Sequence, residues 1–279
     1  MKTKLNWKYS QYLYWLILII VFYIINSLFT VKKSNINYGY LKNWFDLSSY
    51  GLNYGHSELI DPKDPKKEFS LNPRDLICDP SSNKSVLLIT MVAIAPSYFG
   101  KRTLIRSTWG NKQQFGQDMK LIFLLAKSLN ETINKMIDEE FKLHNDIVQK
   151  NYTDSYYNLT AKIMMGLNWI SKYCPNSKYI LRINDDVIVN TFNMIKYFNS
   201  LKYEKNQIFG YGITGVSPIR DPGSKFYVSE KEYPKSYYDP YIEGSAYLFT
   251  TDLAATFYNK YLEYHCPPFS IWLEDVYIG

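Results

Sequence analysis

The chain has 279 residues, of which 46% are hydrophobic and 17% aromatic, including 27 tyrosines. This length and apolar content suffice for the core of one large α/β domain or of two small ones. The formal net charge of +6 is spread along the chain, without a long basic block or an RNA- or DNA-binding motif. We therefore exclude nucleic acid as the partner and expect the basic surface to suit an acidic diphosphate ligand.

An apolar run near the N-terminus predicts a membrane anchor. Residues 12–29 carry no charged side chain, and as a helix they would span roughly 27 Å, enough to cross the core of a bilayer. A cleaved signal peptide is the alternative, but the run is long and no small-x-small cleavage site follows it. Lysines lie on both sides, with a mild excess before the run. We expect a cytoplasmic tail at 1–11, a signal anchor at 12–31 and a lumenal remainder.

The segment after the anchor is polar and predicts a stem. Residues 32–72 are rich in Asn, Ser and Gly and show no sustained apolar period. We expect the folded domain to occupy residues 73–279.

Glycosylation motifs and cysteines agree with a lumenal domain. Four sequons of the form Asn-x-Ser/Thr begin at Asn83, Asn130, Asn151 and Asn158. Asn158 precedes a predicted helix, so a structural role is the alternative for it. The three cysteines, Cys78, Cys174 and Cys266, allow one disulfide with one thiol left over, and spacing does not decide which pair forms.

Strands and helices alternate through the predicted domain. The predicted strands are 85–95, 120–127, a short one beginning at 146–148, and 179–181; the predicted helices are 101–109, 131–144 and 158–173. In the last helix Leu159, Ile163, Leu167 and Ile170 share one face with Gly166. This alternation predicts an α/β fold with a mostly parallel sheet.

Two adjacent carboxylates follow the fourth predicted strand. The apolar run Tyr179-Ile-Leu181 leads to Asp185 and Asp186. Ligands of open α/β sheets bind at the carboxyl ends of strands, and paired carboxylates suit Mg²⁺ or Mn²⁺ holding a diphosphate. By itself the Asn-Asp-Asp sequence favours an ordinary polar turn.

Other segments change that balance, because six of them occur together in a familiar order. They are Arg102–Trp109, Asp154–Lys162, Trp169–Asn176, Asn184–Asn190, Tyr241–Tyr247 and Glu274–Gly279. Together they resemble the β-1,3-galactosyltransferase family, which also contains β-1,3-N-acetylglucosaminyltransferases, over roughly residues 73–279. The resemblance implies a single-pass type II Golgi membrane enzyme with a GT-A fold, an Mn²⁺ cofactor and inversion at the sugar carbon. The implied substrates are UDP-galactose or UDP-N-acetylglucosamine and an acceptor glycan on a glycoprotein or glycolipid.

The resemblance also assigns roles to the acidic residues. Asp186 matches the direct metal ligand of the family. Asn184 stands where the family usually has Asp; it keeps an oxygen donor but loses a charge, so we expect a weaker metal contact. Asp185 would hold the loop or bind the nucleotide. Asp275 matches the proposed general base, and the alternative for the pair Glu274-Asp275 is an acidic helix N-terminus.

Three cations receive two interpretations each. Arg102 and Arg106 follow the first predicted strand, where a nucleotide sugar would approach, but arginines one turn apart are also common as ion-paired helix residues. Lys162 lies on a predicted buried helix and would meet either a phosphate or a buried acid. Residues 241–247 suit an acceptor-side wall, because Gly244 lets the backbone approach a ligand closely.

Two function classes follow from the sequence. The first is an active transferase, favoured by the presence of Asp185, Asp186 and Asp275 together. The second is a catalytically silent relative serving as a lumenal binding partner or chaperone, which Asn184 favours. Family members continue beyond the segment that ends here at Gly279, which favours either the second class or a truncated sequence.

Overall fold

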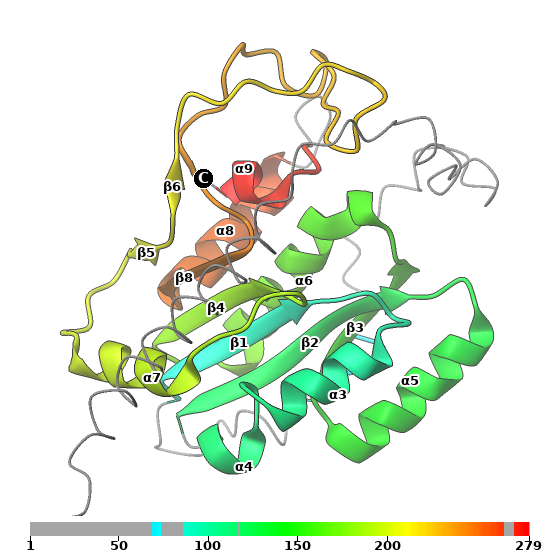
Figure 1. Cartoon of the computed structure of the whole chain (residues 1–279), viewed down its shortest axis with the longest axis vertical. Helices are drawn as coiled ribbons and strands as arrows, with labels where there is room; N and C mark the ends of the chain where they lie inside the picture. Colours follow the sequence, from blue (N-terminus) through cyan, green and yellow to red (C-terminus); the bar gives the residue numbers. More distant parts are fainter. Residues whose placement is uncertain (1–68, 74–85, 117, 265–270, 279) are drawn as a thin grey trace, which may run out of the picture. The chain divides into compact units, whose positions relative to one another are not determined.

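The computed structural model describes residues 69–73, 86–116, 118–264 and 271–278 (Figure 1). All of them belong to one unit of the chain, Glu58–Gly279. The predicted tail and anchor, most of the stem, and the first sequon lie outside the described residues. Within the described ranges, no helix has the length and apolar character needed to cross a membrane.

A six-stranded sheet forms the centre of this unit. Its strands are β1 (Leu88–Ala93), β2 (Met119–Lys127), β3 (Ile147–Thr153), β4 (Tyr179–Asn184), β5 (Ile208–Phe209) and β8 (Ala246–Thr250). The order is β3-β2-β1-β4-β8-β5, with the first four strands parallel and β8 antiparallel to both of its neighbours. The predicted strands and the mostly parallel sheet are confirmed. Strands β1, β2 and β4 are mostly apolar because both faces of the sheet are covered there.

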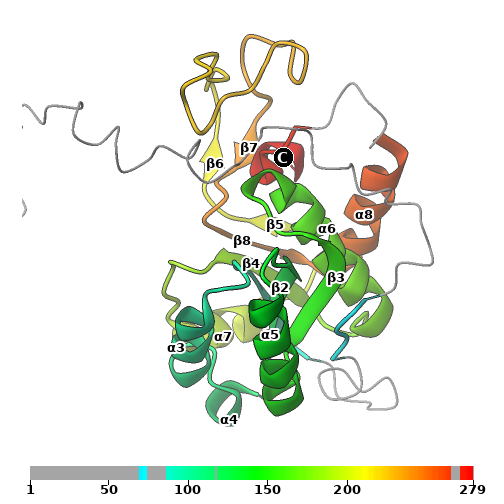
Figure 2. The ribbon, with the colours of Figure 1, turned by 90° about the vertical axis from the view of Figure 1, so that its right-hand side faces the viewer.

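Helices cover the two faces of the sheet (Figure 2). They are α3 (Phe99–Ser107), α4 (Lys112–Phe115), α5 (Glu131–His144), α6 (Leu159–Tyr173), α7 (Thr191–Ser200), α8 (Asp252–Tyr264) and α9 (Glu274–Ile278), with a 3₁₀ turn η2 (Tyr156–Asn158) before α6. Helices α3, α4, α5 and α7 pack on one face, and α6 and α8 pack on the other. The three predicted helices are confirmed as α3, α5 and α6. A small second sheet pairs β6 (Gly212–Ile213) with β7 (Tyr241–Ile242).

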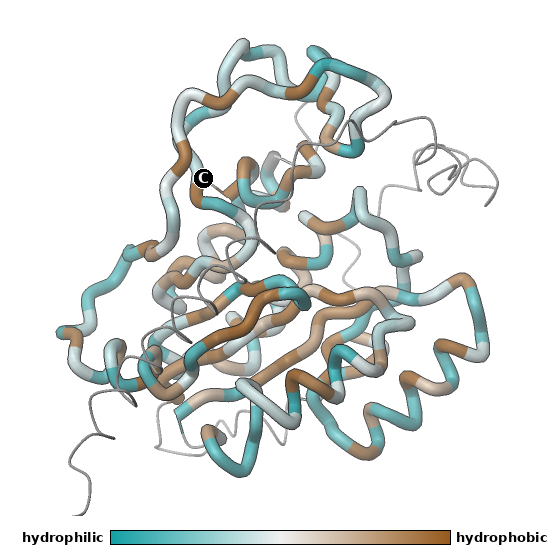
Figure 3. Tube along the Cα trace, in the orientation of Figure 1, coloured by the Kyte–Doolittle hydropathy of each residue, from teal (hydrophilic) through white to brown (hydrophobic). Residues whose placement is uncertain are grey.

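The core lies between the sheet and these helices, and Figure 3 shows hydrophobic residues along the central strands. Helix α6 is buried on more than its predicted face, because α8 packs against its other side. Gly166 explains its close approach to the sheet. A Cβ there would lie 2.7 Å from Leu124 Cδ1, so a larger residue would force the helix outward.

The residues just before the predicted domain boundary pack on the domain. Gln149 in β3 donates its backbone N–H to the Leu71 carbonyl at 3.1 Å. The indole Nε1 of Trp169, which is fully buried, donates to Asn72 Oδ1 at 2.8 Å. The last residues assigned to the stem thus contact β3 and α6 of the domain.

The cysteines and sequons that predicted a lumenal domain differ in their exposure to solvent. Cys174 is buried and disulfide-bonded, while the other two cysteines lie outside the described residues. Asn130 and Asn151 are exposed. Asn158 instead donates from Nδ2 to the Thr153 carbonyl at 3.1 Å, and the threonine of its sequon, Thr160, is buried. The structural alternative is favoured for Asn158.

Candidate active site

The order of the strands defines the place where a ligand would bind. From β1 the chain proceeds to β2 and β3 on one side, and then returns to place β4 on the other side of β1. The order therefore reverses between β1 and β4, whose ends pair at Ala93 and Asn184. In open α/β sheets, ligands bind outside the carboxyl ends of the strands at such a switch point. The predicted acidic motif lies there.

The two carboxylates of the motif differ in their surroundings. Asn184 ends β4, and Asp185 and Asp186 form the turn that follows. Asp185 Oδ1 lies 3.1 Å from Nζ of Lys101 in the first turn of α3. Asp186 is exposed, and within the described part of the chain no hydrogen bond or ion pair holds its carboxylate. One carboxylate thus fixes the turn and the other is available to a ligand.

A buried arginine lies two residues before the motif. Nη1 of Arg182 donates to Asn184 Oδ1 at 2.6 Å and to the Gly244 carbonyl, and Nη2 donates to Glu274 Oε2 at 2.6 Å. The Tyr247 hydroxyl donates to the other oxygen of Glu274. Burial alone would lower the pKa of Arg182, but Glu274 raises it, so the guanidinium keeps its charge. We call these five residues the Arg182 network; it joins the end of β4 to the start of α9.

Asp275 lies beside this network at the N-terminus of α9. A Cβ at Gly244 would lie 2.8 Å from Asp275 Oδ2, so the missing side chain leaves room for the carboxyl group. Burial raises the pKa of Asp275 above its ordinary value, and the N–H of Val276, 2.9 Å away, offsets that only in part. The pair Glu274-Asp275 does begin a helix, as the structural alternative predicted. Its members nevertheless differ, because Glu274 is paired with Arg182 at 2.6 Å whereas, among the described residues, Asp275 forms no ion pair.

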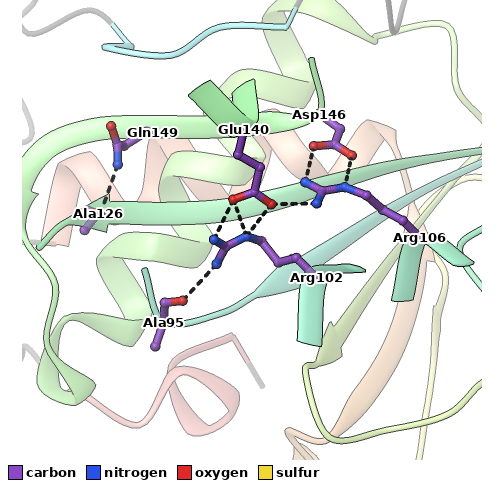
Figure 4. Close-up of polar contacts among 7 residues, drawn as sticks. All are labelled: Ala95, Arg102, Arg106, Ala126, Glu140, Asp146 and Gln149. Carbon is purple, nitrogen blue, oxygen red and sulfur yellow. Dashed lines mark hydrogen bonds and ion pairs between the residues drawn. The ribbon is translucent and has the colours of Figure 1, made fainter. Parts of the chain in front are cut away.

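The geometry favours the structural interpretation of Arg102 and Arg106 (Figure 4). Arg102 is fully buried; it donates from Nε and Nη2 to Glu140 at 2.9 and 2.6 Å, and from Nη1 to the Ala95 carbonyl at 3.1 Å. Arg106 donates twice to Asp146 at 2.7 Å and once to Glu140 at 2.5 Å. Burial alone would raise the pKa of Glu140, but both arginines hold that pKa below its ordinary value. These guanidinium groups are directed to protein acceptors.

Lys162 pairs with an acid, Asp154, whose side chain is 17% exposed, which is closer to the second of its two predicted alternatives than to a phosphate contact. Its Nζ lies 2.5 Å from Asp154 Oδ1 and donates to the Ile94 carbonyl at 3.0 Å. Arg102 and Lys162 thus reach adjacent carbonyls just after β1 from helices on opposite faces of the sheet. The expectation that Arg102, Arg106 and Lys162 bind the nucleotide is not supported by this geometry. Arg102 and Lys162 hold the end of β1 in place, and Arg106 binds Glu140 and Asp146.

The donor set fits a metal ion that arrives with a diphosphate. Among the described residues, no group of three or more His, Cys, Asp or Glu side chains is arranged to hold a metal. Mg²⁺-like ions are commonly bound by one or two carboxylates, with substrate phosphates and water completing the shell. The free carboxylate of Asp186 meets that requirement. Asn184 fits poorly as a second ligand, because its oxygen already accepts from the cationic Arg182.

Comparison with known proteins identifies the family of this chain. Residues 100–279 match the family model described as Galactosyltransferase. This chain belongs to the galactosyltransferase family. Mouse β-1,3-galactosyltransferase 1 is 35% identical over 195 residues, covering 69% of this chain and 58% of the relative. Human lactosylceramide 1,3-N-acetyl-β-D-glucosaminyltransferase is 31% identical over 252 residues, covering 87% of this chain and 64% of the relative.

The chain therefore spans less than two thirds of the length of these relatives. A solved structure of the bifunctional glycosyltransferase WbbM aligns with 72% of this chain and 37% of that chain. Its sequence identity is 11% and its TM-score 0.37, which is too low to support an argument about the fold. Membership of the galactosyltransferase family, first indicated by the six segments, is confirmed by the family model and the curated relatives.

Sequence reasoning missed two residues of the site in this galactosyltransferase family member. Lys101 carries no local signal, because its partner Asp185 is distant in the sequence. Arg182 does carry one: it interrupts the apolar run of a strand predicted to be buried. A charged side chain in that position requires a buried partner of opposite charge. In the structure that partner is Glu274, whose Oε2 lies 2.6 Å from Arg182 Nη2.

Proposed function

We propose that this chain is a UDP-sugar-dependent β-1,3-hexosyltransferase with a GT-A-type fold. One observation carries the proposal: a buried arginine joins the strand end that presents the free Asp186 to the helix start that presents Asp275. A transferase of this class needs both groups at one edge of the sheet, one for the diphosphate and one for the acceptor hydroxyl. The names of the relatives, which include a galactosyltransferase and an N-acetylglucosaminyltransferase, support both candidate sugars.

On the donor side, Asp186 would hold Mn²⁺ together with the diphosphate of the UDP-sugar. When bound, the ion supplies positive charge that stabilises the departing diphosphate. Asp185 keeps the turn in position through Lys101, whose side chain is 43% exposed. Lys101 adds positive charge at the same edge of the sheet, where a diphosphate would lie. The Arg182 network fixes the backbone that carries Asp186.

On the acceptor side, Asp275 would act as general base. It accepts the proton of the acceptor hydroxyl while that oxygen attacks the anomeric carbon of the sugar. The bond from this carbon to the diphosphate oxygen breaks on the opposite face, and UDP leaves with the electron pair, so the configuration is inverted. The raised pKa of Asp275 makes the carboxylate a stronger base than an exposed aspartate. Because only the ionised form accepts a proton, turnover should fall as pH drops through this raised pKa.

We place the enzyme in the Golgi membrane with its domain in the lumen, acting on glycans of glycoproteins or glycolipids. The apolar run at residues 12–31 supports the anchor. The disulfide at Cys174 suits an oxidising compartment, and exposed sequons begin at Asn130 and Asn151. Glycosidase treatment should shift the mobility of the expressed protein, and intact microsomes should protect its C-terminus from protease. An unglycosylated, protease-sensitive domain would contradict the lumenal location.

The deciding experiment measures transfer by the full chain in microsomes. UDP-galactose and UDP-N-acetylglucosamine are offered separately with simple sugar acceptors and Mn²⁺, and we expect transfer of galactose to lead. Asp275→Asn, which is nearly isosteric, should reduce turnover by roughly 10²-fold or more without weakening UDP binding. The control is Glu139→Gln, an exposed carboxylate on α5, which should change neither.

Two outcomes would contradict the proposal. Normal turnover of Asp275→Asn would remove Asp275 from the role of base. Absence of transfer from either donor by the unmodified chain, with the protein folded, would favour the catalytically silent relative.

A further inference from the structure

Aromatic side chains gather beside the proposed base. Tyr156 and Tyr157 in η2 are 51% and 46% exposed. Their ring centroids lie 5.2 and 5.3 Å from that of Trp272, which precedes Asp275 by three residues. We call Tyr156, Tyr157 and Trp272 the aromatic platform. Half of the surface of its two tyrosines remains open, so packing of the core does not account for them.

The platform is held rigidly from beneath. Trp272 is 7% exposed, and its indole Nε1 donates to the Tyr227 carbonyl at 3.2 Å. The hydroxyl of Thr160, in the first turn of α6, donates to the Trp272 carbonyl at 3.0 Å. This second bond ties the segment that leads into α9 to the helix that follows η2. A fixed aromatic surface binds a ligand with little loss of side-chain entropy.

The platform and the base lie in one neighbourhood. With only two residues between them along the chain, the Cα atoms of Trp272 and Asp275 are at most about 11 Å apart. Burial raises the pKa of Tyr156, and the charge of Asp275 raises it further. A molecule that presents a hydroxyl to Asp275 can therefore extend over Tyr156.

The local charge selects among possible ligands. Glu243, the residue directly before Gly244, is close enough to Asp275 to raise its pKa. The charge of Arg182 lowers the pKa of Asp275, but its guanidinium is buried and paired with Glu274 at 2.6 Å, so it presents no cation to a ligand at the surface. An anionic sugar would meet two carboxylates here, so a neutral one is favoured.

We infer that the aromatic platform binds a neutral pyranoside of the acceptor, with the C–H face of the sugar stacked on Tyr156 and a hydroxyl directed to Asp275. Pyranosides suit such a surface because one face of the ring carries mainly C–H groups and the rim carries hydroxyls. The tyrosines offer the same combination of apolar ring and polar edge. This inference rests on the proposed function and deepens it by naming the acceptor subsite.

The test compares Tyr156→Ala and Tyr156→Phe with Tyr197→Ala in the full chain. Tyr197, on α7, is 54% exposed and serves as a matched control away from the platform. We expect Tyr156→Ala to raise the KM for a neutral acceptor about tenfold, equivalent to about 1.4 kcal/mol, and to leave the KM for the UDP-sugar unchanged. Tyr156→Phe, which keeps the ring, should retain most of the affinity, and Tyr197→Ala should change neither constant. An unchanged acceptor KM in Tyr156→Ala would overturn the inference.

A binding measurement separates this inference from the proposed reaction. Saturation-transfer NMR on the full chain with UDP, Mn²⁺ and methyl β-galactoside reports contact without turnover. Signal that is lost in Tyr156→Ala but kept in Tyr197→Ala supports the platform, even if the chain transfers no sugar. Absence of signal from the unmodified chain, or equal signal from a sialylated glycoside, would overturn it.

Discussion

Two buried networks of charged residues support the switch point, one on each side of it. On the β1 side, Arg102 and Lys162 hold the carbonyls that follow the strand, and each is paired with a carboxylate, Glu140 or Asp154. On the β4 side, Arg182 holds Asn184, Gly244 and Glu274. Both use the same chemistry, in which a cation in the interior is balanced by a carboxylate and further hydrogen bonds.

The two networks differ in whether unpaired carboxylates lie beside them. On the β1 side the cations are directed to protein acceptors, and the network ends in the scaffold. On the β4 side the network borders Asp186, which is exposed and unpaired within the described residues, and Asp275. The buried cations of this fold therefore hold the ends of β1 and β4 in place. We expect the reaction to depend on the carboxylates that these cations do not pair with.

The largest expected effect is a loss of turnover, and it should distinguish the two networks when Arg182 or Arg102 is replaced by lysine. Lysine keeps the charge but loses the planar fork, so Arg182→Lys cannot serve Glu274, Asn184 and Gly244 together. We expect both Arg182→Lys and Arg102→Lys to lower the Tm. Only Arg182→Lys should lose turnover per folded molecule, by roughly 10²-fold, because it displaces the base relative to the donor.

The measurement pairs circular dichroism with initial rates at a temperature where both variants are folded. Titration of each variant with UDP controls for loss of the donor site. Equal losses of turnover in the two variants would show that the β1-side network also positions reacting groups.

The next effect is on stability, and Glu140→Gln addresses the β1-side network. The pKa of Glu140 in the folded state is held below its ordinary value, which is about 4.3 in the unfolded chain. Its stabilisation is therefore present above the unfolded pKa and is lost as pH falls through the folded pKa. Glu140→Gln should lower the unfolding free energy by about 2 kcal/mol at neutral pH, with a smaller difference from wild type in acid. Urea denaturation at several pH values checks this, and a constant difference would contradict it.

Those elements of the fold were predicted whose hydrophobic residues repeat with a regular local period. Helix α5 has the predicted bounds, and α6 begins one residue after its prediction. Helix α7 (Thr191–Ser200) was not predicted, and its buried contacts come from packing on the sheet. The position of β8 between β4 and β5 also depends on long-range pairing that no local pattern reveals.

The candidate site was predictable in part. The switch-point location of Asp185 and Asp186 followed from the strand that precedes them. Their difference did not, because it depends on Lys101, far away in sequence. Arg102 and Arg106 kept two interpretations for the same reason. Their spacing does not reveal that helix α5, distant in the sequence, supplies the carboxylate of Glu140.

A smaller effect tests the contact between the Arg182 network and the base. In Gly244→Ala the new methyl group would lie 2.8 Å from Asp275 Oδ2, so the carboxyl group must shift. We expect turnover to fall about tenfold, since small displacements of a reacting group are costly, while the KM for the UDP-sugar stays constant. Gly212→Ala is the matched control, because a Cβ there meets no atom within 4 Å. Normal turnover in Gly244→Ala would mean that Asp275 tolerates displacement, which a general base does not.

The smallest expected effect concerns Asn184, where the family usually has Asp. If Asn184 bound the metal ion, Asn184→Asp would restore a charge and tighten Mn²⁺-dependent UDP binding by an order of magnitude or more. Its oxygen instead accepts from Arg182 at 2.6 Å, so the added charge would be directed mainly to that guanidinium. We therefore expect UDP affinity to change by less than about threefold.

The neighbouring isosteric change, Asp186→Asn, provides the comparison for this result. It removes the free carboxylate, so it should abolish the dependence of UDP binding on a divalent ion. Calorimetric titration of both variants with UDP, in Mn²⁺ and in excess chelator, measures the two effects on one scale. A gain of tenfold or more in Asn184→Asp would assign Asn184 to the metal. It would also imply that Arg182 releases Asn184 when the donor binds. The β4 side of the switch point would then change conformation on binding, whereas the cations on the β1 side keep their protein partners.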